Sequence, residues 1–113
     1  MSNVITLSEL QTQQSEWSRN NFPNQPSWHP LLGAVEELGE LCHAHLKAVQ
    51  GIRMNENHRL NKEDAVADAI IFLCGYCTAE GIDIARAVDR TWNEVKQRDW
   101  RYPIINSKEN DHE

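Results

Sequence analysis

The chain has 113 residues, of which 40% are hydrophobic and 25% charged, and its formal net charge is -6. This length fits one domain with a small core, so we expect another subunit to cover part of its apolar surface. An acidic protein of this size is poorly suited to hold nucleic acid through the phosphates alone. It can still bind a phosphorylated small molecule if metal ions lie between carboxylates and phosphate.

The cysteines indicate a reducing compartment. Their number is odd, and the segment Met1–Leu10 lacks a basic stretch followed by an apolar one. We therefore expect a cytoplasmic protein in which Cys42, Cys74 and Cys77 are free thiols. The longest apolar run, Ala69–Cys74, is too short to span a membrane, so we expect no membrane partner.

The first helix is expected over Leu7–Arg19. Thr6 or Ser8 can cap its start, and Glu9 suits the first turn, where the helix dipole favours acidic residues. The following segment, Asn20–Pro30, is rich in proline, asparagine and serine, which indicates a loop.

The second helix is expected over Leu31–Gln50, opened by Pro30 and stopped by Gly51. Steps of three and four predict an apolar stripe along it. The stripe consists of Leu31, Val35, Leu38, Cys42, Leu46 and Val49. A separate polar stripe consists of Glu36, Glu40, His43 and Lys47.

The third helix is expected to begin at an Asn61 cap, reach about Glu80 and stop at Gly81. Its middle is apolar on nearly every side except at Asp68, which indicates burial, here between subunits. Asp83 is expected to cap a fourth helix that ends near Arg98. The apolar face of that helix consists of Ile84, Val88, Trp92 and Val95.

These elements predict an all-α protein of four helices, with a single domain over residues 1–105 and a disordered polar tail over residues 106–113. The sequence contains no internal repeat and no low-complexity tract. Trp92 and Trp100 are expected to serve in packing.

Five carboxylates carry the candidate chemistry. Asp68 stands alone in apolar surroundings, where an unpaired charge is costly, and Asp64 lies four residues earlier on the same helical face. Glu36, Glu37 and Glu40 repeat this spacing on the preceding helix. If the two acidic faces meet, a cation must compensate their repulsion, and all-oxygen ligands favour Mg²⁺, with Mn²⁺ as a substitute. The alternative is that the glutamates line a solvated face, which leaves Asp68 unexplained.

Two stretches, GAVEELGEL (residues 33–41) and EDAVADAIIFL (residues 63–73), resemble the MazG-type all-α nucleoside triphosphate pyrophosphohydrolases. The signature of that superfamily is EExxE on one helix and ExxD on the next. The similarity runs from about Trp17 to Pro103. The flanking SWHPLLG and LKAVQGIR segments resemble the short single-domain members of bacteria and phages.

The resemblance implies a MazG-like four-helix bundle whose core is completed in a homodimer or a dimer of dimers. It also implies Mg²⁺-dependent hydrolysis of a nucleoside or deoxynucleoside triphosphate to the monophosphate and pyrophosphate. Glu37 and Glu40 match the metal ligands of ExxE, and Asp68 matches the Asp of ExxD. Glu36 matches the leading Glu, whose implied role is to orient or deprotonate water.

The chain departs from the family pattern at Ala65, where the Glu of ExxD would fall. Asp64 is the natural substitute, because its offset of four residues from Asp68 keeps it on the same face. The departure leaves the number of metal ions open. It also supports an alternative function, a catalytically inactive MazG-like nucleotide-binding or regulatory protein.

Further residues are candidates for binding the nucleotide. For the base, Trp28 is the first choice for stacking and Trp17 the second. For the phosphates, the basic candidates are Lys47, Arg53, Lys96 and Arg98.

A carboxylate-bridged redox bundle is a rival from another class, because Glu40 and His43 have the Glu-x-x-His spacing of di-iron proteins. Those proteins need two such pairs, and this chain has no second one. Cys74-x-x-Cys77 also lacks a companion pair, so two core thiols are expected there rather than a zinc or redox motif.

Overall fold

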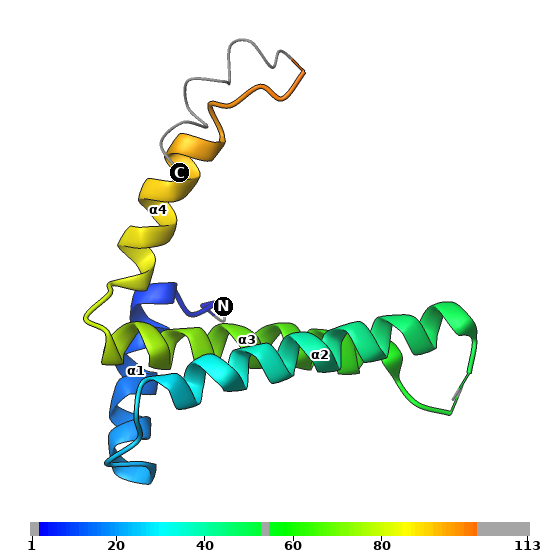
Figure 1. Cartoon of the computed structure of the whole chain (residues 1–113), viewed down its shortest axis with the longest axis horizontal. Helices are drawn as coiled ribbons and strands as arrows, with labels where there is room; N and C mark the ends of the chain where they lie inside the picture. The colour runs from blue at the N-terminus through cyan, green and yellow to red at the C-terminus, as the bar shows by residue number, and fades with distance from the viewer. Residues whose placement is uncertain (1–2, 53–54, 102–113) are drawn as a thin grey trace.

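The computed structural model describes residues 3–52 and 55–101. It contains four helices: α1 (Leu7–Asn21), α2 (Trp28–Gln50), α3 (His58–Ala79) and α4 (Ile84–Val95). The described residues include no strand, so the predicted all-α class is confirmed. In Figure 1, α2 and α3 lie side by side as a long antiparallel hairpin, α1 crosses one end of it, and α4 runs away from it.

The helix ends follow largely from local chemistry. The Thr6 hydroxyl accepts a hydrogen bond from the Glu9 N–H, and the Glu9 carboxylate accepts one from the Thr6 N–H, which forms a capping box. Gly51 ends α2 at φ 70°, and Gly81 has the same φ just after α3. Glycine adopts this left-handed conformation without steric cost, as predicted for both stops. The Asp83 carboxylate caps α4 by accepting from the Arg86 N–H.

Two helices begin earlier than predicted. α2 starts at Trp28, because a proline in the first turn, such as Pro30, loses no intrahelical hydrogen bond. α3 starts at His58, where the Asn57 side chain accepts from the Leu60 N–H. The expected Asn61 cap is therefore wrong, because Asn61 lies inside the helix, in its second turn.

Small residues allow α2 and α3 to approach closely. Ala34 and Ala44 of α2, with Ala65 and Ala69 of α3, are among the few buried apolar residues of the described chain. Gly33 is the tightest point, because a Cβ built there would lie 2.5 Å from Cε1 of the Phe72 ring. Alanine and glycine thus form the contact that holds the hairpin together.

Gly33→Ala is expected to destabilise the chain by about 1–3 kcal/mol, because the added methyl group displaces the Phe72 ring. Gly39→Ala is the matched control in the same helix, since a Cβ added there would meet nothing within 4 Å. That control should gain about 0.5–1 kcal/mol from helix propensity. Urea denaturation of both variants measures the difference, and equal shifts would contradict the close approach.

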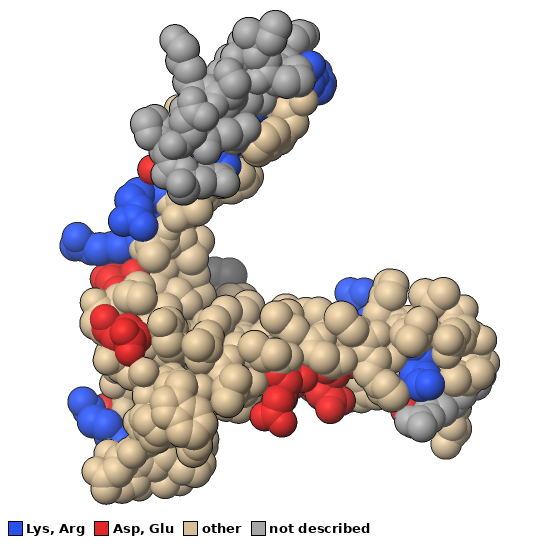
Figure 2. Space-filling model, in the orientation of Figure 1, with Lys and Arg blue, Asp and Glu red and all other residues tan. Residues whose placement is uncertain are grey.

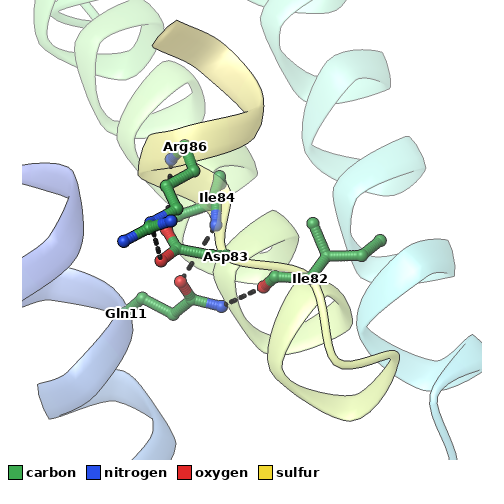
Figure 3. Close-up of polar contacts among 5 residues, drawn as sticks. All are labelled: Gln11, Ile82, Asp83, Ile84 and Arg86. Atoms are coloured by element: carbon green, nitrogen blue, oxygen red, sulfur yellow. Dashed lines mark hydrogen bonds and ion pairs between the residues drawn. The ribbon is translucent and has the colours of Figure 1, made fainter. Parts of the chain in front are cut away.

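The Gln11 side chain fixes the junction between α3 and α4 (Figure 3). Its Nε2 donates to the Ile82 carbonyl at 2.7 Å and to the Thr78 hydroxyl at 3.2 Å. Its Oε1 accepts from the Ile84 N–H at 3.1 Å. One α1 side chain therefore ties the end of α3 to the first turn of α4.

α4 does not lie along the other three helices, since its axis makes an angle of 107° with that of α3. Of its predicted apolar face only Ile84 is buried, while Val88 and Trp92 are exposed. Trp92 and Trp100 were expected to pack, and in this chain both are more than half exposed. The predicted tail, residues 106–113, lies outside the described residues.

Among the described helices, none is by itself long and apolar enough to cross a membrane. By length and composition only, α3 and α4 taken together across their bend meet that requirement.

Candidate functional site

An acidic hollow of about 470 Å³ lies between α2 and α3. Four of the five predicted acids line it, two from each helix, namely Glu37, Glu40, Asp64 and Asp68. Its other lining residues are His43, Ala44, Lys47, Glu56, His58, Asn61 and Ala65. Figure 2 shows acidic side chains gathered along one edge of the hairpin. The predicted meeting of the two acidic faces is therefore present.

Helical periodicity explains why these residues share one hollow. On α2, Glu40, His43 and Lys47 follow one another at steps of three and four. On α3, Asn61, Asp64 and Asp68 do the same. Because the two helices lie side by side, the two polar stripes can line the same hollow.

Glu37 lies in an environment that disfavours its ionised form. It is half-buried, and desolvation raises the pKa of its carboxyl group. The negative charges of Asp68, Glu40 and Glu36 raise the pKa further. Since Asp68 belongs to α3 and the glutamates to α2, this coupling shows that the acids of the two helices interact across the hollow.

The donor set of the hollow suits a hard divalent cation, since carboxylate oxygens are the ligands that Mg²⁺ prefers. No three Asp, Glu, His or Cys side chains in the described part of the chain are grouped closely enough to hold a metal ion. Metal binding would therefore require the long glutamate side chains to change rotamer.

Asp68 differs from its prediction in one respect. The sequence indicated a carboxylate in apolar surroundings that are buried between subunits, and in the single chain Asp68 is exposed. Its apolar neighbours Val66, Ile70, Ile71 and Leu73 are exposed as well. Among the described residues of α3, only Ala65, Ala69 and Cys74 are buried.

The other predicted site residues are more scattered. Lys47 lines the hollow. Glu36 does not line it, but its negative charge contributes to the raised pKa of Glu37. Lys96 and Arg98 belong to the end of the α4 arm and do not line the hollow. Arg53 lies outside the described residues.

An apolar groove of about 560 Å³ runs between α1 and α3, and Asp68 lines both this groove and the hollow. Its aromatic residues are Trp17, Phe22 and Phe72, with the Trp17 and Phe22 rings edge to face at 5.7 Å. The remaining lining residues are Leu10, Gln13, Gln14, Ser18, Gln25, Pro30 and Ile71.

The groove makes Trp17 a better candidate than Trp28 for stacking on the base. Trp28 was the first choice for stacking on a base, but it lines neither space, and its ring lies against His29 at 4.4 Å. Trp17 was the second choice, and it lines the groove beside Asp68.

Sequence reasoning missed Glu56, His58 and Asn61 as lining residues of the hollow. His58 and Asn61 carry a signal, because they extend the stripe of Asp64 and Asp68 toward the helix start at steps of three. A helix that begins after an Asn61 cap does not include His58, so the prediction left this residue out of the stripe. His58 also bonds through Nε2 to the Ile52 carbonyl at 3.1 Å, which joins the α2–α3 connection to α3.

Comparisons with protein-family models, with curated proteins and with solved structures found no match.

Proposed function

We propose that this chain is a Mg²⁺-dependent pyrophosphohydrolase that converts a nucleoside or deoxynucleoside triphosphate to the monophosphate and pyrophosphate. One observation supports this above all: the acidic hollow and the aromatic groove share Asp68 as a lining residue. A nucleotide has a charged end and a flat apolar end, and the two adjoining spaces match those ends in chemistry. The resemblance of residues 33–41 and 63–73 to the family segments points to the same reaction.

The residues have separate roles in this proposal. Glu37, Glu40, Asp64 and Asp68 hold the cation, which when bound neutralises the phosphates and polarises the phosphoryl group under attack. Glu36 lies outside the lining but close enough to raise the Glu37 pKa, and it orients the attacking water or takes its proton. Lys47, which also lines the hollow, donates to phosphate oxygens.

The proposal is tested by incubating the purified chain with Mg²⁺ and each of the eight common nucleoside and deoxynucleoside triphosphates, then measuring released pyrophosphate. Release from at least one substrate, with the monophosphate as co-product, is the expected result. Nucleotide binding without release from any of them, modified bases included, would favour the inactive binding protein. Ala65 supports that second candidate, because it forms part of the hollow where the family signature has a glutamate.

Trp17→Ala tests the groove as the base site. Stacking on an aromatic ring contributes about 1–3 kcal/mol per base. Because Trp17 is already 55% exposed, we expect the lower part of that range, which is about a fivefold to tenfold rise in KM. Trp28→Ala is the matched control, equally exposed at 55% and outside the groove, and its KM should stay near wild type. If steady-state assays show a larger rise in KM for Trp28→Ala than for Trp17→Ala, the base stacks on Trp28 instead.

A further inference from the structure

Gln14 of α1 carries a buried polar atom that the fold does not use. Its side chain is half-buried, and its Oε1 is shielded from solvent with no hydrogen-bond partner among the described residues. A buried amide oxygen without a partner is costly, because it loses its hydrogen bonds to water and gains none in return. Such a group in a folded chain calls for an explanation, and one explanation is a ligand that supplies the missing donor.

Gly75 of α3 leaves the room that this carboxamide occupies. A Cβ built on Gly75 would lie 3.0 Å from Nε2 and 3.5 Å from Oε1 of Gln14, and 3.4 Å from Cβ of Pro30. Gly75 does not have a positive φ, so its backbone conformation does not require glycine. Glycine inside a helix is less favourable than alanine. The chain therefore has a second local cost where α1 meets α3, and this cost gives the Gln14 carboxamide its place.

The two costs coincide beside the aromatic groove. Gln14 lines this groove together with Trp17 and Phe22, and Trp17 follows Gln14 by three residues on the same face of α1. Phe72 lines the groove from α3, three residues before Gly75. Departures from local rules that coincide in this way are expected at functional sites.

The groove needs a polar group if it is to recognise the edge of a base. Stacking accepts every base, because every base has a π face, whereas hydrogen bonds to the edge distinguish one chemical group from another. A carboxamide can accept from an N–H of the base through its oxygen and donate to a neighbouring acceptor through its nitrogen. The polar residues of the groove are Gln13, Gln14, Ser18, Gln25 and Asp68. Of these described residues, only Gln14 has a buried side-chain oxygen or nitrogen without a partner.

We infer that Gln14 is a specificity-determining residue whose Oε1 accepts a hydrogen bond from an N–H group on the edge of the bound base. The terminal torsion of a glutamine side chain has a broad preference, so the carboxamide can turn its oxygen toward the groove. The turn breaks no hydrogen bond of Oε1 to the described chain, since that atom makes none there.

The ligand class is therefore a nucleotide whose base has a free N–H donor on its edge, and N-alkylated bases bind poorly. This inference rests on the proposed function, because it assigns the residue that recognises the base in the same groove.

The test measures binding without turnover, by isothermal titration calorimetry in the presence of Mg²⁺. The ligands are the α,β-methylene analogues of the eight common nucleoside and deoxynucleoside triphosphates, which cannot be hydrolysed at the bond under attack. The nucleotide that binds most tightly is then compared with its counterpart in which each N–H on the base edge carries methyl in place of hydrogen. For wild type, loss of the N–H should raise Kd by about tenfold to hundredfold.

Gln14→Met completes a double-mutant cycle with the methylated ligand, because methionine is unbranched, similar in length and lacks the amide. In this variant the parent and methylated nucleotides should bind about equally. The variant should not lower the Tm, since it removes an unpartnered buried oxygen. Gln13→Met is the matched control, because Gln13 is the neighbouring carboxamide and its side chain is exposed. It should keep the wild-type ratio between the two Kd values.

The outcomes separate this inference from the proposed reaction. A methylation penalty in Gln14→Met that equals the wild-type penalty overturns the inference, and so does a wild type that binds both nucleotides equally. Wild type that binds none of the eight analogues overturns it too, together with the groove as a base site. A chain that releases no pyrophosphate but shows a methylation penalty dependent on Gln14 refutes only the reaction.

Discussion

Asp68→Asn is expected to reduce pyrophosphate release by about 100-fold to 1,000-fold, because a metal-bound carboxylate contributes several kcal/mol to the transition state. The amide keeps the size of the side chain and removes its charge. Asp68 lines both the acidic hollow and the aromatic groove, so no other carboxylate of the hollow is equally placed to replace it. Glu40→Gln should have a comparable effect from the α2 side of the hollow.

The fold should survive both substitutions, since Asp68 and Glu40 are exposed and neither caps a helix. The matched control is Asp89→Asn, an exposed residue of α4 outside both spaces, which should leave the rate within about twofold of wild type. Steady-state release of pyrophosphate at saturating Mg²⁺ gives the comparison. Activity retained in both site variants would end the hypothesis of a carboxylate metal site.

The sequence predicted the helices well where one residue decides a helix end. Gly51 and Gly81 stop helices because their φ of 70° favours glycine, and Thr6 and Asp83 cap helices with side-chain oxygens. The start of α3 was missed because Asn57 and Asn61 are both good caps in the same polar segment. Local propensity cannot choose between these two caps. The cap at Asn57 adds one turn to the start of α3, and this turn includes His58, which lines the hollow.

Burial was predicted less well, for a physical reason. The sequence identifies large apolar residues, but the α2–α3 contact uses Gly33 and alanines, because only small side chains allow the helices to approach this closely. The large residues of the stripe, such as Leu38 and Leu46, remain exposed in the single chain. Periodicity shows that a helix has an apolar side, and it does not show whether that side contacts the same chain or another.

For the site, residue spacing predicted which side chains share a face of one helix, but it did not predict how segments distant in the sequence are placed in space. It put Asp64 with Asp68, and Glu37 with Glu40, on shared faces that the structure joins in one hollow. The direction of α4 depends on hydrogen bonds between Gln11 and residues 78–84, which no local pattern reveals. The positions of Lys96 and Arg98 on that arm were therefore unpredictable from sequence.

Mg²⁺ is expected to raise the Tm of the chain by about 10 °C at pH 8, and by little at pH 4. Ligand at about 100 times its Kd contributes about 2.7 kcal/mol to the free energy of unfolding. In a domain of this size about 1 kcal/mol corresponds to roughly 4 °C. Desolvation and the neighbouring acids raise the folded-state pKa of Glu37 above its ordinary value of 4.5. Metal-free stability from this group is therefore lost as pH rises through the raised pKa.

In the proposed site, a cation that binds the ionised carboxylates would reverse that loss, since it favours the form that the metal-free hollow disfavours. The rise in Tm that Mg²⁺ causes should be large at pH values above the raised pKa of Glu37 and small at pH values below it. Differential scanning calorimetry with and without Mg²⁺ across this range measures both effects. A Tm shift of equal size at pH 4 and pH 8 would show that the cation binds elsewhere.

The same calorimetric measurement tests whether Asp64 binds the cation. In the family signature a glutamate stands at the position of Ala65, and Asp64 would have to replace it. Asp64→Asn should remove most of the Mg²⁺-dependent rise in Tm if its carboxylate binds the cation. The neighbouring Glu63 is a matched control, since its Oε2 pairs with Arg59 Nε at 2.9 Å and it does not line the hollow. Glu63→Gln should keep the full rise. If Asp64→Asn also keeps it while Asp68→Asn loses it, Glu37, Glu40 and Asp68 bind the cation without Asp64, and the hollow holds fewer ions than the family pattern implies.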